Sequence, residues 1–180
     1  NPLAADGKTP VNRGAIGRQP WFDCSCCPTN DVRFLASLPG YVYAADSENG
    51  MLYVNLFVAG QAAVELGGQR VRLRQETAYP WDGRVRLRVE PSGQAEFALA
   101  VRIPGWALNQ PVPGDLYRYL APESRQPVLT VNGEVVEPPV EKGYAILRHA
   151  WKPGDVVELQ LPLPVRRVLC HEAVEGNRGR

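Results

Sequence analysis

The sequence of 180 residues predicts a mainly β protein, an antiparallel β-sandwich preceded by a loop and one helix. Three observations predict this class. Apolar and polar residues alternate over short runs, turn residues recur about every ten positions between those runs, and no strand–helix–strand rhythm follows. Short alternating strands joined by tight turns favour antiparallel sheets that pack face to face.

The first forty residues differ from the rest of the chain. Residues 1–20 are rich in Gly, Pro, Asn and Arg without hydrophobic periodicity, which indicates an extended segment. Apolar residues then recur at helical spacing after Pro28, whose fixed backbone angle suits a first helical turn, so a helix is expected over residues 29–38. Pro39 and Gly40 are expected to end it.

Strands are expected from residue 51 onward, and the Asn132-Gly133 pair predicts a tight hairpin turn. Residues 107–127 contain several prolines and predict a long loop, held in place by Tyr117 and Tyr119. The expected strands cover residues 51–58, 62–66, 71–77, 85–89, 97–103, 128–131, 135–136, 144–148, 156–161 and 165–170.

The charge pattern excludes some partner classes. Lys and Arg number 20 against 19 Asp and Glu, so the net charge of +1 indicates no nucleic-acid partner. Alternate arginines in two strands are typical of a solvated sheet face rather than a polyanion-binding stripe, and these are Arg70, Arg72, Arg74, Arg84, Arg86 and Arg88. No apolar run approaches the roughly 18 residues of a membrane span, and no secretory pattern opens the chain.

The densest chemistry lies in Cys24-Ser25-Cys26-Cys27, which holds three of the four cysteines. Thiolates are strong zinc ligands, but the second cysteine pair of a zinc ribbon is absent, so a closed site needs ligands from elsewhere. Cys26 and Cys27 directly precede the expected helix, whose N-terminus favours a thiolate. A metal or nucleophile site is the leading interpretation, and a redox pair and packed thiols remain open.

The other candidate residues have structural explanations. Cys170 is expected as a buried strand residue, His149 as a satisfied sheet residue and His171 as a surface residue. The uneven cysteine layout does not resemble the framework of a disulfide-rich secreted domain, so a reducing compartment, the cytoplasm, is favoured. Core or interdomain packing is expected for Trp81, Trp106 and Trp151, whereas Trp21 and Phe22 suit either a sugar-facing wall or a core.

The cysteine motif resembles that of the bacterial β-L-arabinofuranosidase family, glycoside hydrolase family 127. The similarity continues in order along nearly the whole chain. The segments that carry it are residues 20–30, Arg33, Leu38, 41–43, 75–77, 79–83, 102–106, 131–133, 143–144, Trp151, 154–155 and 177–180.

The resemblance implies a longer parent, in which an α/α barrel with the catalytic site precedes β-sandwich domains. Residues 1–45 would be the end of the barrel, and residues 46–180 a sandwich that reaches the next domain at about residue 177. Cys26 then matches the family's nucleophile and Cys27 its neighbour, and both would bind Zn²⁺. The other ligands, a glutamate and a cysteine, and the acid/base glutamate would come from absent barrel segments, so neither Glu48 nor Glu76 is assigned.

The function implied is that of a retaining glycoside hydrolase with a zinc-bound cysteine nucleophile, acting on an arabinofuranoside-like carbohydrate. The chain alone is expected to be inactive because the acid/base residue is missing. Two alternatives belong to other classes. One is a non-catalytic carbohydrate-binding or structural sandwich, and the other is a thiol-redox module that pairs Cys24 with Cys26 or Cys27. Cys24 also matches a position of the family, but the resemblance assigns no role to it.

Overall fold

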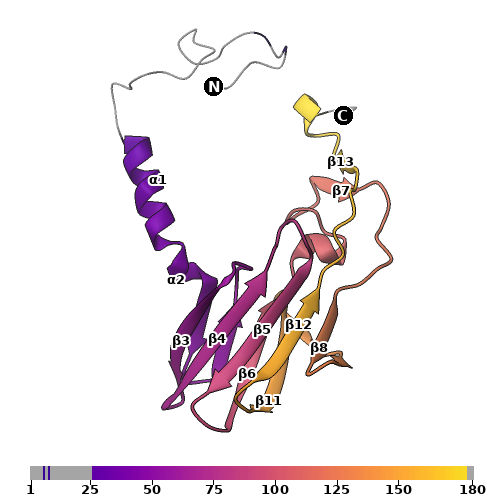
Figure 1. The fold of residues 1–180 in the computed structure, drawn as a ribbon. Coiled ribbons are helices and arrows are strands. Elements are labelled where there is room, and N and C mark those ends of the chain that lie inside the picture. The colour runs from indigo at the N-terminus through magenta and orange to yellow at the C-terminus, as the bar shows by residue number, and fades with distance from the viewer. Residues whose placement is uncertain (1–5, 7, 9–25, 178–180) are drawn as a thin grey trace.

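The structure is a computed structural model that describes residues 6, 8 and 26–177, and it confirms a mainly β fold. Two sheets face one another, and a helix projects from one end (Figure 1). The five-stranded sheet has the order β1 (Tyr43–Asp46), β2 (Met51–Val54), β6 (Ala95–Arg102), β11 (Tyr144–Trp151) and β10 (Val140–Glu141). The six-stranded sheet has the order β3 (Gly60–Leu66), β4 (Gln69–Thr77), β5 (Arg84–Pro91), β12 (Asp155–Gln160), β8 (Val128–Val131) and β9 (Glu134–Val136).

The strand pairing is antiparallel with one exception. β2 runs parallel to β6, with Leu52 opposite Leu99, while the other pairs of both sheets are antiparallel. A parallel pair needs a crossover connection, and here the chain between β2 and β6 supplies three strands of the opposite sheet. The chain therefore leaves the five-stranded sheet after β2, forms three strands of the six-stranded sheet, and returns to the five-stranded sheet as β6.

The core lies between the two sheets. Strands β4 and β5 bury every second residue, as the alternation predicts, and turn the intervening arginines outward. Trp151 is fully buried, and its indole Nε1 donates to the carbonyl of Phe97 at 3.1 Å. The largest fully buried side chains besides it are Leu52, Leu73, Leu87, Leu99, Leu159, Leu161 and Gln75.

The arginines of the outer face are largely paired with glutamates, as expected for a solvated sheet face. Arg84 Nη2 lies 2.6 Å from Glu158 Oε1, and Arg74 Nε lies 3.1 Å from Glu76 Oε1. Pairs of this kind on an exposed face add little stability. Their main effect is to distribute charge across the sheet, which leaves no contiguous positive stripe.

Helix α1 (Cys26–Ser37) begins three residues earlier than the sequence predicts. Pro28 lies inside its first turn, where a missing N–H is tolerated, so the helix extends back over the two cysteines. The helix ends before Pro39, as expected, and the next residues form a second helical turn, α2 (Pro39–Val42), which the sequence did not predict. β1 runs across the expected domain division at residue 45, and that division stays a prediction.

Two expected strands are too long. Residues 55–58 leave the sheet after β2, because the buried side chain of Gln75 donates to the carbonyls of Leu56 and Val58 and so replaces a neighbouring strand. The last strand, β13 (Val168–Cys170), is also short and pairs only with β7 (Tyr117–Tyr119) in a separate two-stranded sheet.

The long loop is held in place as the sequence predicts. It contains η1 (Gly105–Leu108) and β7, and η2 (Glu175–Asn177) follows β13. The guanidinium of Arg166 lies 3.3 Å from the centre of the Tyr119 ring, and Asn177 Nδ2 donates to the Tyr117 hydroxyl at 3.0 Å. Arg166 thus helps to hold the long loop in place, a role that no sequence pattern predicted.

Candidate functional site

Cys26 and Cys27 are the first two residues of α1, at the end of the helix that points away from the sandwich (Figure 1). The Thr29 hydroxyl donates to the Cys26 carbonyl at 3.0 Å within the first turn. Backbone N–H groups of a first helical turn lack partners inside the helix, and together with the helix dipole they favour negative charge. Both thiols therefore lie in the first turn of the helix.

The two sulfur atoms lie 3.7 Å apart. That distance is far beyond a disulfide bond of about 2.05 Å, and both thiols are free and exposed. Two thiolates on one tetrahedral zinc ion, each about 2.3 Å from the metal, lie about 3.8 Å apart by the same geometry. The donor pair thus fits a shared zinc ion without rearrangement.

The surroundings of the thiols are open. No acidic residue lies in the first turn of α1, so no carboxylate there opposes a thiolate. The charged residues of the helix are Asp31 and Arg33, and Arg33 Nη2 donates to Asn30 Oδ1 at 2.7 Å. Every residue of the helix is exposed, including the apolar Val32, Phe34 and Leu35.

The structure brings together two of the three clustered cysteines. Cys24 lies outside the described residues, as do Trp21 and Phe22. Among the residues that the structure describes, no group of three or more His, Cys, Asp or Glu side chains is placed to hold a metal ion. A complete zinc site would therefore need ligands in addition to Cys26 and Cys27.

The remaining candidates lie on or beside strands, and Cys170 is less buried than the sequence predicts. His149 is on β11, with its ring edge-on to Trp151 at 4.8 Å and its Nε2 3.7 Å from Asp155 Oδ2. His171 is exposed, and its Nδ1 accepts the N–H of Ala173. Cys170 is half-buried on β13, and its thiol donates to the Asn177 carbonyl at 3.1 Å.

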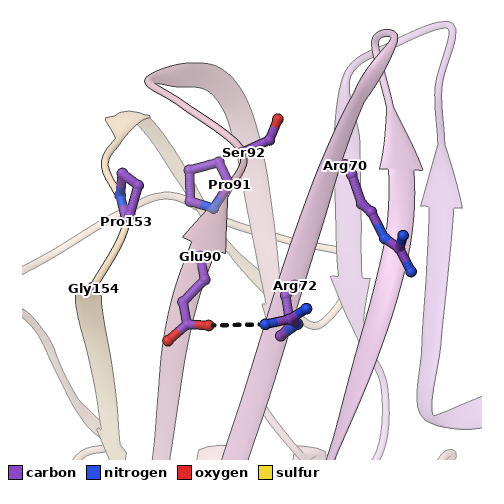
Figure 2. Close-up of a pocket in the computed structure, with 7 residues that line it drawn as sticks. All are labelled: Arg70, Arg72, Glu90, Pro91, Ser92, Pro153 and Gly154. Atoms are coloured by element: carbon purple, nitrogen blue, oxygen red, sulfur yellow. Dashed lines mark ion pairs between the residues drawn. The ribbon is translucent and has the colours of Figure 1, made fainter.

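A hollow of about 520 Å³ lies at the other end of the sandwich, where β4 begins and β5 ends (Figure 2). Arg72 forms an ion pair with Glu90 there at 4.0 Å, while Arg70 points away from that pair. Pro91 and Pro153 close the other side. This hollow lies at the opposite end of the sandwich from the cysteines, so it is not part of the cysteine site.

Comparison with known proteins shows the family to which the chain belongs. The family model described as "Beta-L-arabinofuranosidase, GH127 middle domain" matches residues 51–163. The chain belongs to this family. It is 28% identical over 167 residues to the non-reducing end β-L-arabinofuranosidase of Bifidobacterium longum subsp. longum. The aligned region covers 90% of this chain and 22% of that protein.

Solved structures agree with the family assignment. A GH127 β-arabinofuranosidase superposes with a TM-score of 0.82 at 42% identity, covering 91% of this chain and 25% of the other. The GH127 β-L-arabinofuranosidase of Geobacillus stearothermophilus T6 gives a TM-score of 0.76 at 41% identity, covering 90% and 23%. The chain thus spans about a quarter of the length of the relatives it matches.

The residues that carry the family match lie mostly in the sandwich, whereas the paired thiols lie on the helix before it.

No helix in the described part of the chain is both long and apolar enough to cross a membrane. The tryptophans of the sandwich differ in burial. Trp151 is buried, Trp106 is partly buried against the core, and Trp81 is exposed.

Proposed function

We propose that this chain is part of a longer retaining glycoside hydrolase that cleaves β-L-arabinofuranosides, with Cys26 as the nucleophile. One observation carries the proposal. A chain of this family presents two adjacent free thiols at an exposed helix N-terminus, with their sulfur atoms 3.7 Å apart. The names of the relatives support a carbohydrate substrate of that class.

In the proposed reaction the Cys26 thiolate attacks the anomeric carbon, and the bond from that carbon to the leaving oxygen breaks. The leaving oxygen takes a proton from an acid residue outside residues 26–177. Water, deprotonated by the same residue, then breaks the carbon–sulfur bond, which releases the sugar with retained configuration and restores the thiolate. Two inversions at one carbon give the retention.

Cys26 and Cys27 would together hold the zinc ion, and the ion when bound keeps sulfur ionised at neutral pH. The two residues are adjacent in the first turn of α1, so one ion could be shared between their sulfur atoms. Two further ligands and the acid/base residue are expected from segments that precede this chain in the longer protein. The chain alone is therefore expected to be inactive.

The test uses the full-length enzyme and an arabinofuranoside substrate. Cys26→Ser is expected to lower kcat by about 10³-fold or more, because a hydroxyl at this position is a much weaker nucleophile. Cys170→Ser is the matched control, since it removes another free thiol from the same chain, and it is expected to keep full activity. Mass spectrometry of enzyme quenched during turnover is expected to find the sugar on Cys26.

Zinc content gives an independent measurement. Cys27→Ser is expected to lower the bound zinc, while the Cys170 control keeps it. Wild-type activity in the Cys26 variant, with no zinc in any form of the enzyme, would instead favour a sandwich with a structural or carbohydrate-binding role. A reversible disulfide from Cys24 to either thiol would favour a redox module.

A further inference from the structure

Trp81 is left almost entirely in water. Its side chain is 91% exposed, although it is among the largest apolar groups in the protein. Tryptophan is enriched at the centres of protein interfaces, because covering its ring removes a large apolar area from water while its N–H still finds an acceptor. An exposed tryptophan on a rigid support therefore indicates a surface that another element covers.

The loop that carries Trp81, residues 78–83, is rigid. The backbone N–H of Trp81 donates to the Ala78 carbonyl at 2.9 Å. The Thr77 hydroxyl accepts the N–H of Tyr79 at 3.0 Å and donates to the Arg84 carbonyl at 2.7 Å. The exposure of the indole is therefore a built feature of the loop.

The loop is also tied to the rest of the sandwich. The Leu161 N–H donates to the Gly83 carbonyl at 2.9 Å, and a Cβ at Gly83 would lie 1.9 Å from the Leu161 carbonyl oxygen. Tyr79 packs edge-on against Phe57 at a ring separation of 5.5 Å. These contacts bring the segment that follows β12 alongside the loop.

The segment that follows β12 also exposes apolar side chains. Pro80 and Leu163 line one hollow of about 380 Å³. Leu163 is 41% exposed, and Val165 is exposed over its whole side chain. We call Pro80, Trp81, Leu163 and Val165 the Trp81 surface.

The polar groups beside the Trp81 surface already have partners within the chain. Arg166 Nη2 donates to Asn109 Oδ1 at 2.6 Å and to the Ala121 carbonyl at 3.0 Å. Glu123 accepts from Arg125 at 2.9 Å. A sugar site needs free hydrogen-bonding groups placed around an aromatic ring, whereas the charged groups beside this surface, Arg166 and Glu123, bond within the chain. An apolar protein surface is the better fit.

The connection between β4 and β5, which carries Trp81, lies at the end of the sandwich from which α1 projects (Figure 1). The Asn55 N–H donates to the carbonyl of Val42, where α2 ends, and Phe57 packs on Tyr79 of the loop. The apolar side chains of α1 are exposed at the same end. The end of the sandwich from which α1 projects thus carries two uncovered apolar surfaces, in a chain whose relatives are about four times as long.

We propose that the Trp81 surface docks onto the preceding domain of the same polypeptide, the domain that also covers α1. The inference rests on the proposed function in one respect, because it requires the longer protein. The docked surface would be apolar, with an acceptor for the Trp81 indole N–H. Such an interface would fix the sandwich against the domain that holds the nucleophile helix.

The test measures the solvent access of Trp81 in the full-length protein by hydroxyl-radical oxidation and mass spectrometry. The indole is expected to oxidise about tenfold more slowly in the native protein than in the unfolded one, because a docked ring excludes solvent. Oxidation at the unfolded rate would overturn the proposal. Protection that appears only in a dimer, or only after an arabino-oligosaccharide is added, would overturn it as well, since either assigns a different occupant.

Thermal unfolding of the full-length protein adds a second measurement. Trp81→Ala is expected to lower Tm by several degrees. Val135→Ala is the matched control, because Val135 is 68% exposed on β9, away from this surface, and its substitution is expected to leave Tm unchanged. Equal Tm values for the two variants would contradict docking.

The outcome is separable from that of the proposed function. Cys26→Ser is expected to abolish hydrolysis and leave Trp81 protected, because the indole is remote from the thiol. An active enzyme with a freely oxidised Trp81 would overturn the docking alone. A protected Trp81 in an enzyme that is indifferent to Cys26→Ser would support the docking and overturn the nucleophile.

Discussion

Gln75 is the only polar side chain buried in the core of the described residues, and we expect it to be a main determinant of stability. It is 1% exposed, and its Nε2 donates to the Leu56 carbonyl at 3.1 Å and to the Val58 carbonyl at 2.6 Å. These carbonyls lie beyond the end of β2, so the amide supplies the donors that a neighbouring strand would otherwise supply.

The informative substitution is Gln75→Met, which nearly conserves volume and removes both donors. A buried carbonyl left without a donor costs about 1–3 kcal/mol. Because segment 55–58 lies at the edge of the core and can partly regain water, we expect a loss of about 2–4 kcal/mol for the pair. For a chain of this size that corresponds to a fall in Tm of roughly 4–16 °C.

Gln75→Glu serves as a comparison with a defined pH dependence. Burial opposite two carbonyls raises the pKa of the new carboxyl in the folded state, because the charged form is desolvated and repelled. The folded state then holds its proton more tightly than the unfolded state does. Stability is therefore lost as pH rises from the unfolded pKa of about 4.3 toward the folded value, and it is regained at lower pH.

Urea unfolding followed by circular dichroism, at pH 4 and pH 7, measures both variants. The methionine variant is expected to show the same deficit at the two values, and the glutamate variant a larger deficit at pH 7. A methionine variant within about 0.5 kcal/mol of the original chain would refute the reasoning, since the two hydrogen bonds would then contribute nothing net. A glutamate variant with an unchanged pH dependence would refute the electrostatic part.

Two further predictions concern the ends of the sandwich. Gly83→Ala places a Cβ 1.9 Å from the Leu161 carbonyl oxygen and is expected to cost more than about 2 kcal/mol in urea unfolding, whereas Gly93→Ala, with nothing within 4 Å, is the neutral control. Hydrogen bonds from Arg125 lower the pKa of Glu123 to about 2, so its ion pair is formed above the ordinary carboxyl pKa and is lost as pH falls toward about 2. An NMR titration is expected to show that low midpoint and its rise in Arg125→Gln, and an ordinary midpoint in the original chain would contradict the contact.

The sequence predicts β4 and β5 well, and the reason is local. In a strand the side chains alternate between two faces, so a run such as Val85, Leu87 and Val89 between arginines states directly which residues are buried. The same holds for the Asn132-Gly133 turn, whose residues both have positive φ, as the turn between β8 and β9 requires. Elements whose cause lies within a few residues could be predicted.

The errors have non-local causes. Residues 55–58 have the composition of a strand, but Gln75, which is distant in sequence, takes the place of the neighbouring strand. The parallel pairing of β2 with β6 is a property of the whole topology, and local turn signals bear only on antiparallel neighbours.

The candidate site shows the same division between local and distant causes. The position of Cys26 and Cys27 at a helix start follows from Pro28 and the apolar spacing after it, and the structure places both thiols in the first turn. The direction in which they face is not set locally, because α1 is exposed along its length and is connected to the sandwich through α2 and β1. A nucleophile must be held close to its line of attack, since a displacement of about 1 Å can lower a rate about 100-fold. The proposed chemistry of Cys26 therefore depends on what covers α1, and a Trp81 surface docked onto that same domain would hold the sandwich and the helix in one fixed arrangement.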